Sequence, residues 1–415
     1  MTNSTSNPLV KVLNNWILSL FIILTSLVTL LSVTSYFFRD NIYLEFTTHF
    51  KHQYLLLGLL PLIYFALTRR KVWLIVTLFC LLINLTEIIP WYIPKLSFGA
   101  SGEPMRLFLF NVSFSNTQYA DAIALVKEEK PTIAAFLEAK DPWPKQLEAL
   151  REVLPYTISI PELQMEVYSR LPLQESEILE YGKYRGLVKL DLKIAGADAS
   201  VIVTHSYPQF YFGKPGDFGV ADYGYDFAPL APQRAIPRWG EQNYQSPPAR
   251  DCSLGDLGGL TKTKQSRIHT SIQQRQQEDL EKQRWQWRNQ DLEKEIGDYI
   301  RQIQKPVVLI GDLNVTMWSP YYKSLIESSG LHDARAGFGI LPTLSQFSPA
   351  NPWLAIPVDH CLVSRDVKVI KMRTGPDLGS DHLPVITDIA LRASQKSEVR
   401  SQKSEVRSQK SEVRS

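Results

Sequence analysis

Three long apolar runs dominate the N-terminal part of the chain. Residues 17–38 contain no charged side chain, and further apolar runs cover residues 54–67 and 72–93. At roughly 1.5 Å per residue the first run makes a helix of about 33 Å, enough to cross the hydrocarbon core of a bilayer. It is too long for the core of a signal peptide, and no small-residue cleavage site follows it. The pattern predicts a transmembrane region over residues 1–98, with helices at about 17–38, 54–67 and 72–93.

Basic residues between the second and third runs indicate the orientation. Arg69, Arg70 and Lys71 lie there, and short basic loops are retained in the cytoplasm. Three spans then place the N-terminus in the cytoplasm and everything after residue 94 outside it. If the short second run is re-entrant, two spans remain and the large domain is cytoplasmic. We favour a multi-pass protein of the cell membrane with an extracytoplasmic domain, because the two-span alternative leaves the basic loop outside.

Glu87 interrupts the third run, which closes with Pro90, Trp91 and Tyr92. A carboxylate inside a span can serve a function. The simpler interpretation, which we prefer, is a residue near the helix end whose side chain reaches the interface.

A second pattern begins after residue 103. Residues 105–112 form an apolar run typical of a buried strand, and residues 187–194 alternate as a half-buried strand does. Further strands are predicted at 132–137, 199–204, 307–310, 359–364 and 383–390, and helices at 120–130 and 271–304. Many strands with few intervening helices favour packed sheets flanked by helices. We therefore expect one folded domain over residues 103–393.

Two segments lack this periodicity. Residues 209–270 are rich in Gly, Pro, Tyr and Asp and predict an irregular insertion, either a loop beside the substrate or a tolerated surface insertion. Residues 394–415 contain three copies of Ser-Gln-Lys-Ser-Glu-Val-Arg. One Val per copy is too little apolar surface for a coiled coil. We expect a solvated low-complexity tail rather than a tether to an anionic surface.

Charge and cysteine content exclude some classes of protein. The formal net charge is +3, and the repeat tail accounts for all of it, so the bulk charge shows no large nucleic-acid footprint. Hydrophobic residues make up 44%, which indicates a folded chain. The spacing of Cys80, Cys252 and Cys361 matches no zinc pattern. A Cys252–Cys361 disulfide is one possibility, and two free thiols are the simpler expectation.

Polar side chains follow or adjoin the predicted strands, and their order is informative. They are Asn111, Glu138, His205, Asp312, Asn314, Asp359, Asp381 and His382. Each alone has a plain structural explanation, such as Asx side chains in the turn after Gly311. Together they offer oxygen ligands for a hard divalent cation, with amide and imidazole groups that orient water and steady negative oxygens. The combination predicts a metal site for phosphate chemistry.

These residues lie in segments that resemble the endonuclease/exonuclease/phosphatase superfamily. In order, the segments are Leu109–Asn111, Phe136–Glu138, Tyr168–Arg170, Thr204–Pro208, Arg288–Gln290, Gly311–Asn314, Val358–His360 and Ser380–Pro384. They span nearly all of residues 103–393. Gly-Asp-Leu-Asn followed by Ser-Asp-His is specific, whereas Arg-Asn-Gln is weak alone. The resemblance implies an α/β fold, a four-layered α/β/β/α sandwich, and Mg²⁺- or Mn²⁺-dependent hydrolysis of phosphoesters.

The resemblance also implies a metal site. Glu138 would be the main ligand, Asn111 would support the metal or the phosphate, and Asp381 would complete the site or its surroundings. Ser113 departs from the family pattern, because many members carry Asp or Asn at that position. The metal then has one ligand fewer, or Glu138 and Asp381 supply its ligands instead.

The remaining residues take catalytic roles by the same resemblance. Asp312 would orient or deprotonate the attacking water. Asn314 and His205 would donate hydrogen bonds to the phosphoryl oxygens. His382, held by Asp359, would contact the phosphate or act as acid or base. In-line attack on a phosphate needs a cation, a positioned water and such donors.

The substrate class stays open at this stage. A nucleic acid, a phospholipid headgroup and a small phosphoester all fit, and the lipid bilayer is the expected partner of the helices. The lack of a basic excess leans against sequence-specific nucleic-acid work. A rival hypothesis is a catalytically inactive membrane scaffold that keeps the fold. Retention of Glu138, Asp312, Asn314, Asp381 and His382 argues against it, because a scaffold has no chemical need for all five.

Overall fold

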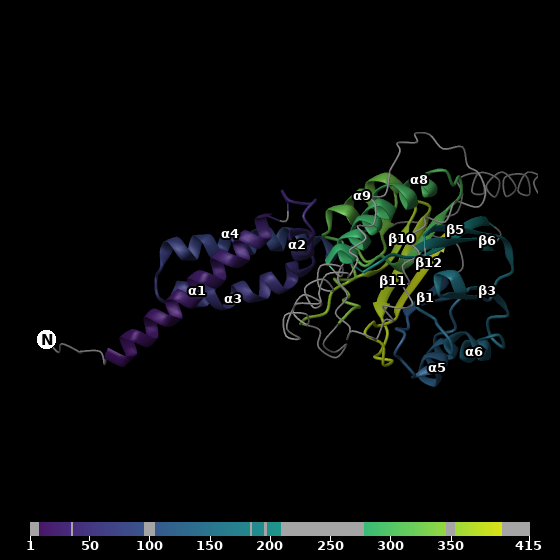
Figure 1. The fold of residues 1–415 in the computed structure, drawn as a ribbon, viewed down its shortest axis with the longest axis horizontal. Coiled ribbons are helices and arrows are strands. Elements are labelled where there is room, and N and C mark those ends of the chain that lie inside the picture. Colours follow the sequence, from purple (N-terminus) through teal and green to yellow (C-terminus); the bar gives the residue numbers. More distant parts are fainter. Residues whose placement is uncertain are drawn as a thin grey trace, which may run out of the picture.

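The computed structural model describes residues 8–34, 36–94, 104–182, 185–194, 197–208, 278–345 and 353–391. The expected insertion at 209–270 and the tail at 394–415 lie outside these ranges, and so does Cys252. Cys80 and Cys361 are buried free thiols. Figure 1 shows a helical N-terminal region that extends from one side of a domain built of sheets and helices.

Three helices of the N-terminal region are long and apolar enough to cross a membrane. They are α1 (Pro8–Thr34), α3 (Lys51–Leu67) and α4 (Lys71–Ile88), and α3 is extended at its start by α2 (Ile42–Phe46) and η1 (Thr47–Phe50). The first helix therefore ends earlier than expected, and the second begins earlier. The Asn41 side chain sets the second start, because it accepts hydrogen bonds from the N–H groups of Tyr43 and Leu44. The turns from Ile42 to Phe50 contain several polar residues, so the apolar run in the sequence does not include them.

The strands of the described residues form two six-stranded sheets. The first has the order β11 (Val367–Thr374), β12 (Val385–Leu391), β1 (Met105–Asn111), β2 (Ile133–Leu137), β4 (Met165–Ser169) and β3 (Tyr156–Ile160). The second has the order β5 (Leu173–Gly182), β6 (Arg185–Ile194), β7 (Ala197–His205), β8 (Val307–Asp312), β10 (Asp359–Val363) and β9 (His332–Asp333). Each sheet has a parallel pair within it, β1 with β2 and β7 with β8.

The two sheets pack face to face, and helices cover their outer faces. Leu107, Leu109, Val201 and Ile310 lie in the core between the sheets. The alternate side chains of β1, including Phe108, pack outward in a cluster with α5 (Tyr119–Glu129) and α6 (Trp143–Leu147). The second sheet is covered by the helix that includes 278–290, by η5 (Asp291–Glu295), α8 (Ile296–Arg301) and α9 (Pro320–Ser329). The expected α/β/β/α sandwich is confirmed.

The strands predicted from sequence are present with boundaries shifted by at most a few residues. The sequence does not predict strands β3, β4, β5, β9 and β11. β5 carries Glu175, Glu177 and Glu180 at an exposed edge, so its apolar signal is weak. The charged helix expected at 271–304 ends at Arg301, and its buried face includes Leu292.

Strand register brings the ends of several strands to one edge of the sandwich. Asn111 pairs with Leu137 at the ends of β1 and β2. His205 pairs with Asp312 at the ends of β7 and β8, and Asp312 pairs with Asp359 at the start of β10. Parallel strands end at the same edge, so their terminal polar residues converge there.

Candidate active site

Asn111 links the two sheets at this edge. Its Nδ2 donates to Glu138 Oε1 at 3.1 Å and to Asp312 Oδ2 at 3.0 Å. Its Oδ1 accepts from the Ser113 N–H at 3.1 Å, which directs the amide nitrogen toward the two carboxylates. Glu138 has a φ of 56°, a left-handed conformation that is uncommon for a non-glycine residue. The chain turns sharply after β2 and holds this carboxylate beside the second sheet.

Gly311 and Asn314 fix the position of Asp312. A Cβ on Gly311 would lie 2.1 Å from the carbonyl oxygen of Thr204, so only glycine lets β8 approach β7 so closely. Asp312 is fully buried, and its Oδ1 accepts from the Asn314 N–H at 2.8 Å. Asn314 has a φ of 52°, and its Nδ2 donates to the carbonyl oxygen of Ser206 at 2.7 Å. The Gly-Asp-Leu-Asn turn is thus rigid.

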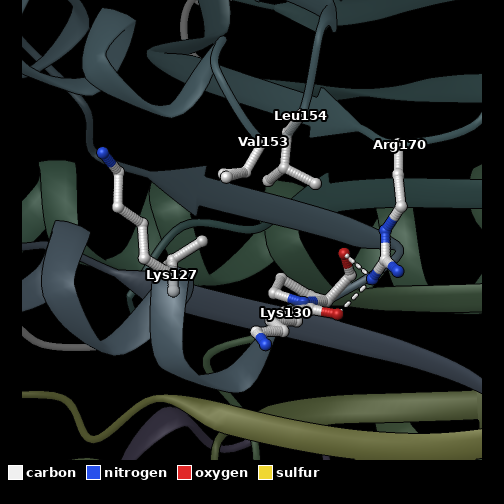
Figure 2. A pocket seen from close by; sticks show the side chains of 7 residues that line it. Lys127, Lys130, Val153, Leu154 and Arg170 are labelled. Atoms are coloured by element: carbon white, nitrogen blue, oxygen red, sulfur yellow. Dashed lines mark hydrogen bonds between the residues drawn. The ribbon is translucent and has the colours of Figure 1, made fainter.

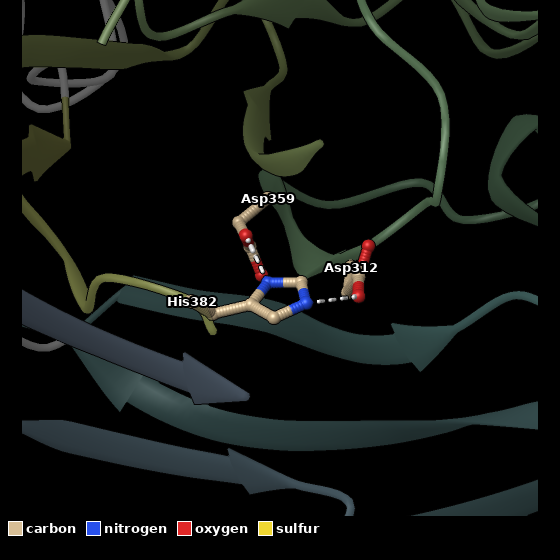
Figure 3. Close-up of side chains that lie close together, drawn as sticks. All are labelled: Asp312, Asp359 and His382. Carbon is tan, nitrogen blue, oxygen red and sulfur yellow. Dashed lines mark hydrogen bonds and ion pairs between the residues drawn. The ribbon is translucent and has the colours of Figure 1, made fainter. Parts of the chain in front are cut away.

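His382 lies between two carboxylates, as Figure 3 shows. Its Nδ1 is 2.8 Å from Asp359 Oδ2, and its Nε2 is 3.7 Å from Asp312 Oδ2. Ser380 holds the segment in place, because its hydroxyl donates to the carbonyl oxygen of Asn111 and accepts from the His382 N–H. The Asp359 carboxylate therefore orients the ring so that Nε2 faces Asp312.

His205 faces the same space from the end of β7. Its Nε2 is 3.7 Å from Glu138 Oε1 and 3.8 Å from Asp312 Oδ2. This nitrogen is buried and has no hydrogen-bond partner among the described residues. Burial, with the charge of the nearby His382, lowers the pKa of His205 to about 4. His205 is neutral at physiological pH and aims an unsatisfied ring nitrogen into the site.

The carboxyl groups of Glu138 and Asp312 both have raised pKa values. Burial, with the negative charge of Asp381, raises the pKa of Glu138 to about 7. Burial, with the charge of Asp359, raises the pKa of Asp312 well above its ordinary value. Asp381 itself is exposed at the rim, where it acts on Glu138 through space. Two raised carboxyl pKa values side by side indicate that positive charge is needed between them.

The histidine on the other side of Asp312 is charged. Burial opposes this, but the carboxylates of Asp359 and Asp312 outweigh it and raise the pKa of His382 well above its ordinary value. Burial also opposes the ionised form of Asp359, but the charge and hydrogen bond of His382 outweigh it and keep the pKa of Asp359 low. His382 and Asp359 therefore form an ion pair within the site.

The donor set fits a divalent cation between Glu138 and Asp312. Atoms of Asp312, Asp359 and His382 also lie within 4.8 Å of one another, close enough for a metal. However, the charged His382 donates to Asp359 and offers no lone pair there. Glu138 and Asp312 instead share one amide donor and both have raised pKa values, which a nearby cation would lower.

Three residues support the site, and two of them carry no clear signal in the sequence. The hydroxyl of Thr343 accepts from the N–H groups of Val358 and Asp359, both at 3.2 Å. Arg335 is fully buried and donates to the carbonyl oxygen of Asp359 at 2.6 Å. His360 Nε2 lies 2.7 Å from the carbonyl oxygen of Val315, just after Asn314. Thr343 and Arg335 lie in irregular segments, where no periodicity marks a buried polar residue.

A separate hollow lies at the opposite end of the first sheet (Figure 2). It is lined by Val126, Lys127, Lys130, Pro131, Val153, Leu154 and Arg170. Arg170 donates to the carbonyl oxygen of Pro131, before β2, whereas Glu138 follows β2. The Tyr168–Arg170 segment of the family resemblance therefore does not bring Arg170 to the site.

A model of the Endonuclease/Exonuclease/phosphatase family matches residues 108–382, which include every site residue named above. The chain belongs to this family. Its members are metal-dependent phosphoester hydrolases. No curated protein matches the sequence.

Solved structures of low sequence identity are also similar to the chain. A family member from Bacteroides vulgatus is 15% identical, with a TM-score of 0.44, and the match covers 70% of this chain and 100% of that one. D. rerio TDP2 in complex with a single-strand DNA product is 13% identical, with a TM-score of 0.42, and the match covers 69% and 99%.

Proposed function

We propose that the protein is a membrane-anchored phosphoester hydrolase that uses Mg²⁺ or Mn²⁺. The observation that carries this is the cluster of buried groups at one edge of the sandwich. His205 Nε2 lies within 3.8 Å of both the Glu138 and the Asp312 carboxylates, and His382 Nε2 lies 3.7 Å from Asp312. Asn111 joins the two carboxylates. A protein that only binds another molecule gains nothing from burying these carboxylates together, because their ionised forms repel each other.

Glu138 is the proposed main ligand of the cation. Asn111 holds the Glu138 carboxylate in place, and Asp381 adds negative charge at the rim. When bound, the cation neutralises charge on the phosphate and polarises its oxygens. Ser113 supplies no carboxylate, but its N–H fixes the Asn111 amide, so this position serves the site through the backbone.

Asp312 is the proposed group that orients or deprotonates the attacking water. It is held on both sides, by the Asn314 N–H at Oδ1 and by Asn111 at Oδ2. Its Oδ2 faces His382 Nε2, which can donate to the phosphate or to the leaving oxygen. Asp359 contacts His382 Nδ1, which keeps the ring charged and fixes its orientation. The proton on Nε2 can then be donated to the leaving oxygen.

Asn314 and His205 are the proposed hydrogen-bond donors to the phosphoryl oxygens. Asn314 uses one amide hydrogen for Ser206 and keeps a second. His205 presents the unsatisfied Nε2, which donates if the neutral ring carries its proton there. Donors fixed before the substrate arrives stabilise charge as it develops.

We also propose that the catalytic domain lies outside the cytoplasm. The loop with Arg69, Arg70 and Lys71 joins α3 to α4 at the end remote from the sheets, whereas α4 ends against them. With three spans, the basic loop is cytoplasmic and the domain is on the other side. A C-terminal reporter that is active only in the cytoplasm would have to stay silent.

The test compares Asp312→Asn with the wild type on bis-p-nitrophenyl phosphate and on nicked DNA, with Mg²⁺ or Mn²⁺. We expect the rate to fall by about 10²–10⁴-fold, the usual contribution of a general base. Asp366→Asn is the matched control, because Asp366 is exposed in the turn before β11. Equal rates for wild type and Asp312→Asn, or no hydrolysis of any phosphoester by the wild type, would mean that the protein is not this enzyme.

A further inference from the structure

The N-terminal helices join the sandwich at the same end as the site. His49 Nδ1 lies 3.0 Å from the Thr316 hydroxyl, and the Trp318 Nε1 donates to the carbonyl oxygen of Glu87 at 3.0 Å. Thr316 and Trp318 follow Asn314 closely in the chain. The carbonyl oxygen of Trp91 accepts hydrogen bonds from the N–H groups of Gly337 and Gly339, which follow β9 at the same edge. The edge that carries the site is therefore the edge at which the N-terminal helices join the sandwich. Figure 1 shows these helices extending from one side of the sandwich.

One short segment connects the site to the helices. Leu344 bridges both His382 and Ile356, so Ile356 lies two strand spacings from His382, about 10 Å. The carbonyl oxygen of Ala355 accepts from Gln53 Nε2, in the first turns of α3, at 3.4 Å. Residues 353–356 thus lie between the catalytic histidine and a candidate membrane span.

This segment presents large apolar side chains to solvent. Trp353 is 64% exposed and Leu354 is 45% exposed. Tyr92 and Ile93, at the end of the third candidate span, are also more than half exposed. Tryptophan and tyrosine are enriched where a bilayer meets water, because the ring is apolar and its N–H or O–H is polar. The segment contacts a candidate membrane span through Ala355 and Gln53, and this placement favours the bilayer as the occupant of its exposed apolar side chains.

We propose that Trp353 and Leu354 dip into the bilayer surface and hold the mouth of the site against it, so that the substrate is a phosphoester carried by a lipid of the same membrane. This inference rests on the proposed function. A substrate dissolved in water needs no apolar contact beside the site. The phosphate of a lipid lies at the bilayer surface, at the same depth as a Trp353 side chain inserted there. The site can therefore bind this phosphate while the lipid stays in the membrane.

The experiment uses the full chain reconstituted in phosphatidylcholine vesicles and two probes with the same reacting group. Hexadecyl p-nitrophenyl phosphate resides in the bilayer, and methyl p-nitrophenyl phosphate stays in solution. We expect the wild type to prefer the hexadecyl probe by tenfold or more in kcat/KM. The double variant Trp353→Ala/Leu354→Ala should lose about tenfold on the hexadecyl probe, since two buried apolar side chains contribute at least that much, and keep its rate on the methyl probe.

Tyr156→Ala/Ile178→Ala is the matched control, because these side chains are comparably exposed on outer strands of the two sheets. It should leave both rates unchanged. Equal wild-type rates on the two probes, or equal effects of the double variant on both, would overturn the proposal. So would a change of oligomeric state with the hexadecyl rate intact, which would assign the surface to a second copy. If neither probe nor bis-p-nitrophenyl phosphate is hydrolysed, it is the proposed function that fails.

Discussion

Glu138 combines an uncommon backbone conformation with a perturbed carboxyl group, and both follow from its place between the sheets. Its φ of 56° directs the side chain toward Asp312 rather than into solvent, and burial raises its pKa to about 7. Backbone strain of this kind persists only where the surroundings enforce it, and it is concentrated at functional sites. The residue that the sequence singled out as the main ligand is therefore held in place at some cost in stability.

The raised pKa of Glu138 predicts how metal binding depends on pH. In the metal-free protein the Glu138 carboxyl keeps its proton from its ordinary pKa near 4.3 up to about 7, so a cation must displace that proton in this range. The Asp312 carboxyl has a raised pKa as well, so apparent Mn²⁺ affinity should rise by at least tenfold per pH unit up to about pH 7 and more slowly above it. Calorimetry in two buffers of different ionisation enthalpy would count the released protons. Affinity independent of pH across this range would contradict the assignment.

Sequence reasoning singled out residues that the folded chain brings together, but it did not find the residues that support them. Asn111, Glu138 and Asp312 could be found because each ends a recognisable strand, and strand ends converge. Thr343 and Arg335 could not, since they lie in irregular segments and become important only through contacts with Asp359. The orientation of the Asn111 amide also depends on Ser113, whose contribution is a backbone N–H that every residue except proline has.

At the scale of elements, the helix from Ile42 to Leu67 is both a candidate membrane span and part of the catalytic domain. Glu45 and Arg288 form an ion pair at 3.1 Å with both side chains fully buried. Glu45 also accepts from the Ser319 hydroxyl at 2.6 Å, and Arg288 donates to the carbonyl oxygen of Asn314 at 3.1 Å. The weak Arg-Asn-Gln motif thus joins the membrane region to the catalytic turn.

This pair predicts a large effect from a small change in the membrane region. Glu45→Gln leaves the Arg288 guanidinium buried without its counter-charge, which should lower the free energy of unfolding by about 3–5 kcal/mol. Denaturant unfolding of the full chain in detergent, followed by tryptophan fluorescence, measures it. Asp40→Asn is the control, because the Asp40 side chain is 89% exposed and should change stability by less than about 0.5 kcal/mol. Equal stability of the two variants would mean that the helix does not dock in this way.

Apolar patterning identified the helices and most strands, but it could not show how they assemble. The strands of the core were visible because their side chains are buried on both faces or alternate regularly. The start of the helix at Ile42 was not visible, because Glu45 and His49 are polar and are buried against partners hundreds of positions away in the chain. Only the folded chain reveals such pairs.

On the scale of the whole molecule, the sandwich packs directly against the N-terminal helices. Ile88 of α4 belongs to the same apolar cluster as α8 and α9, and Trp318 donates to the end of α4. Because the site lies at this junction, a bilayer around the three candidate spans would fix both the height and the orientation of the site. The full chain is therefore the form in which activity is best measured.

The central claim is that a divalent cation held by Glu138 enables phosphoester hydrolysis. The most direct measurement is the hydrolysis of bis-p-nitrophenyl phosphate by the full chain, stripped with EDTA and then titrated with Mg²⁺ or Mn²⁺, beside Glu138→Gln and the exposed control Glu162→Gln. The structure predicts no rate after EDTA, recovery with metal in the wild type and in Glu162→Gln, and little recovery in Glu138→Gln. A rate that survives EDTA, or a Glu138→Gln variant that recovers like the wild type, would contradict it.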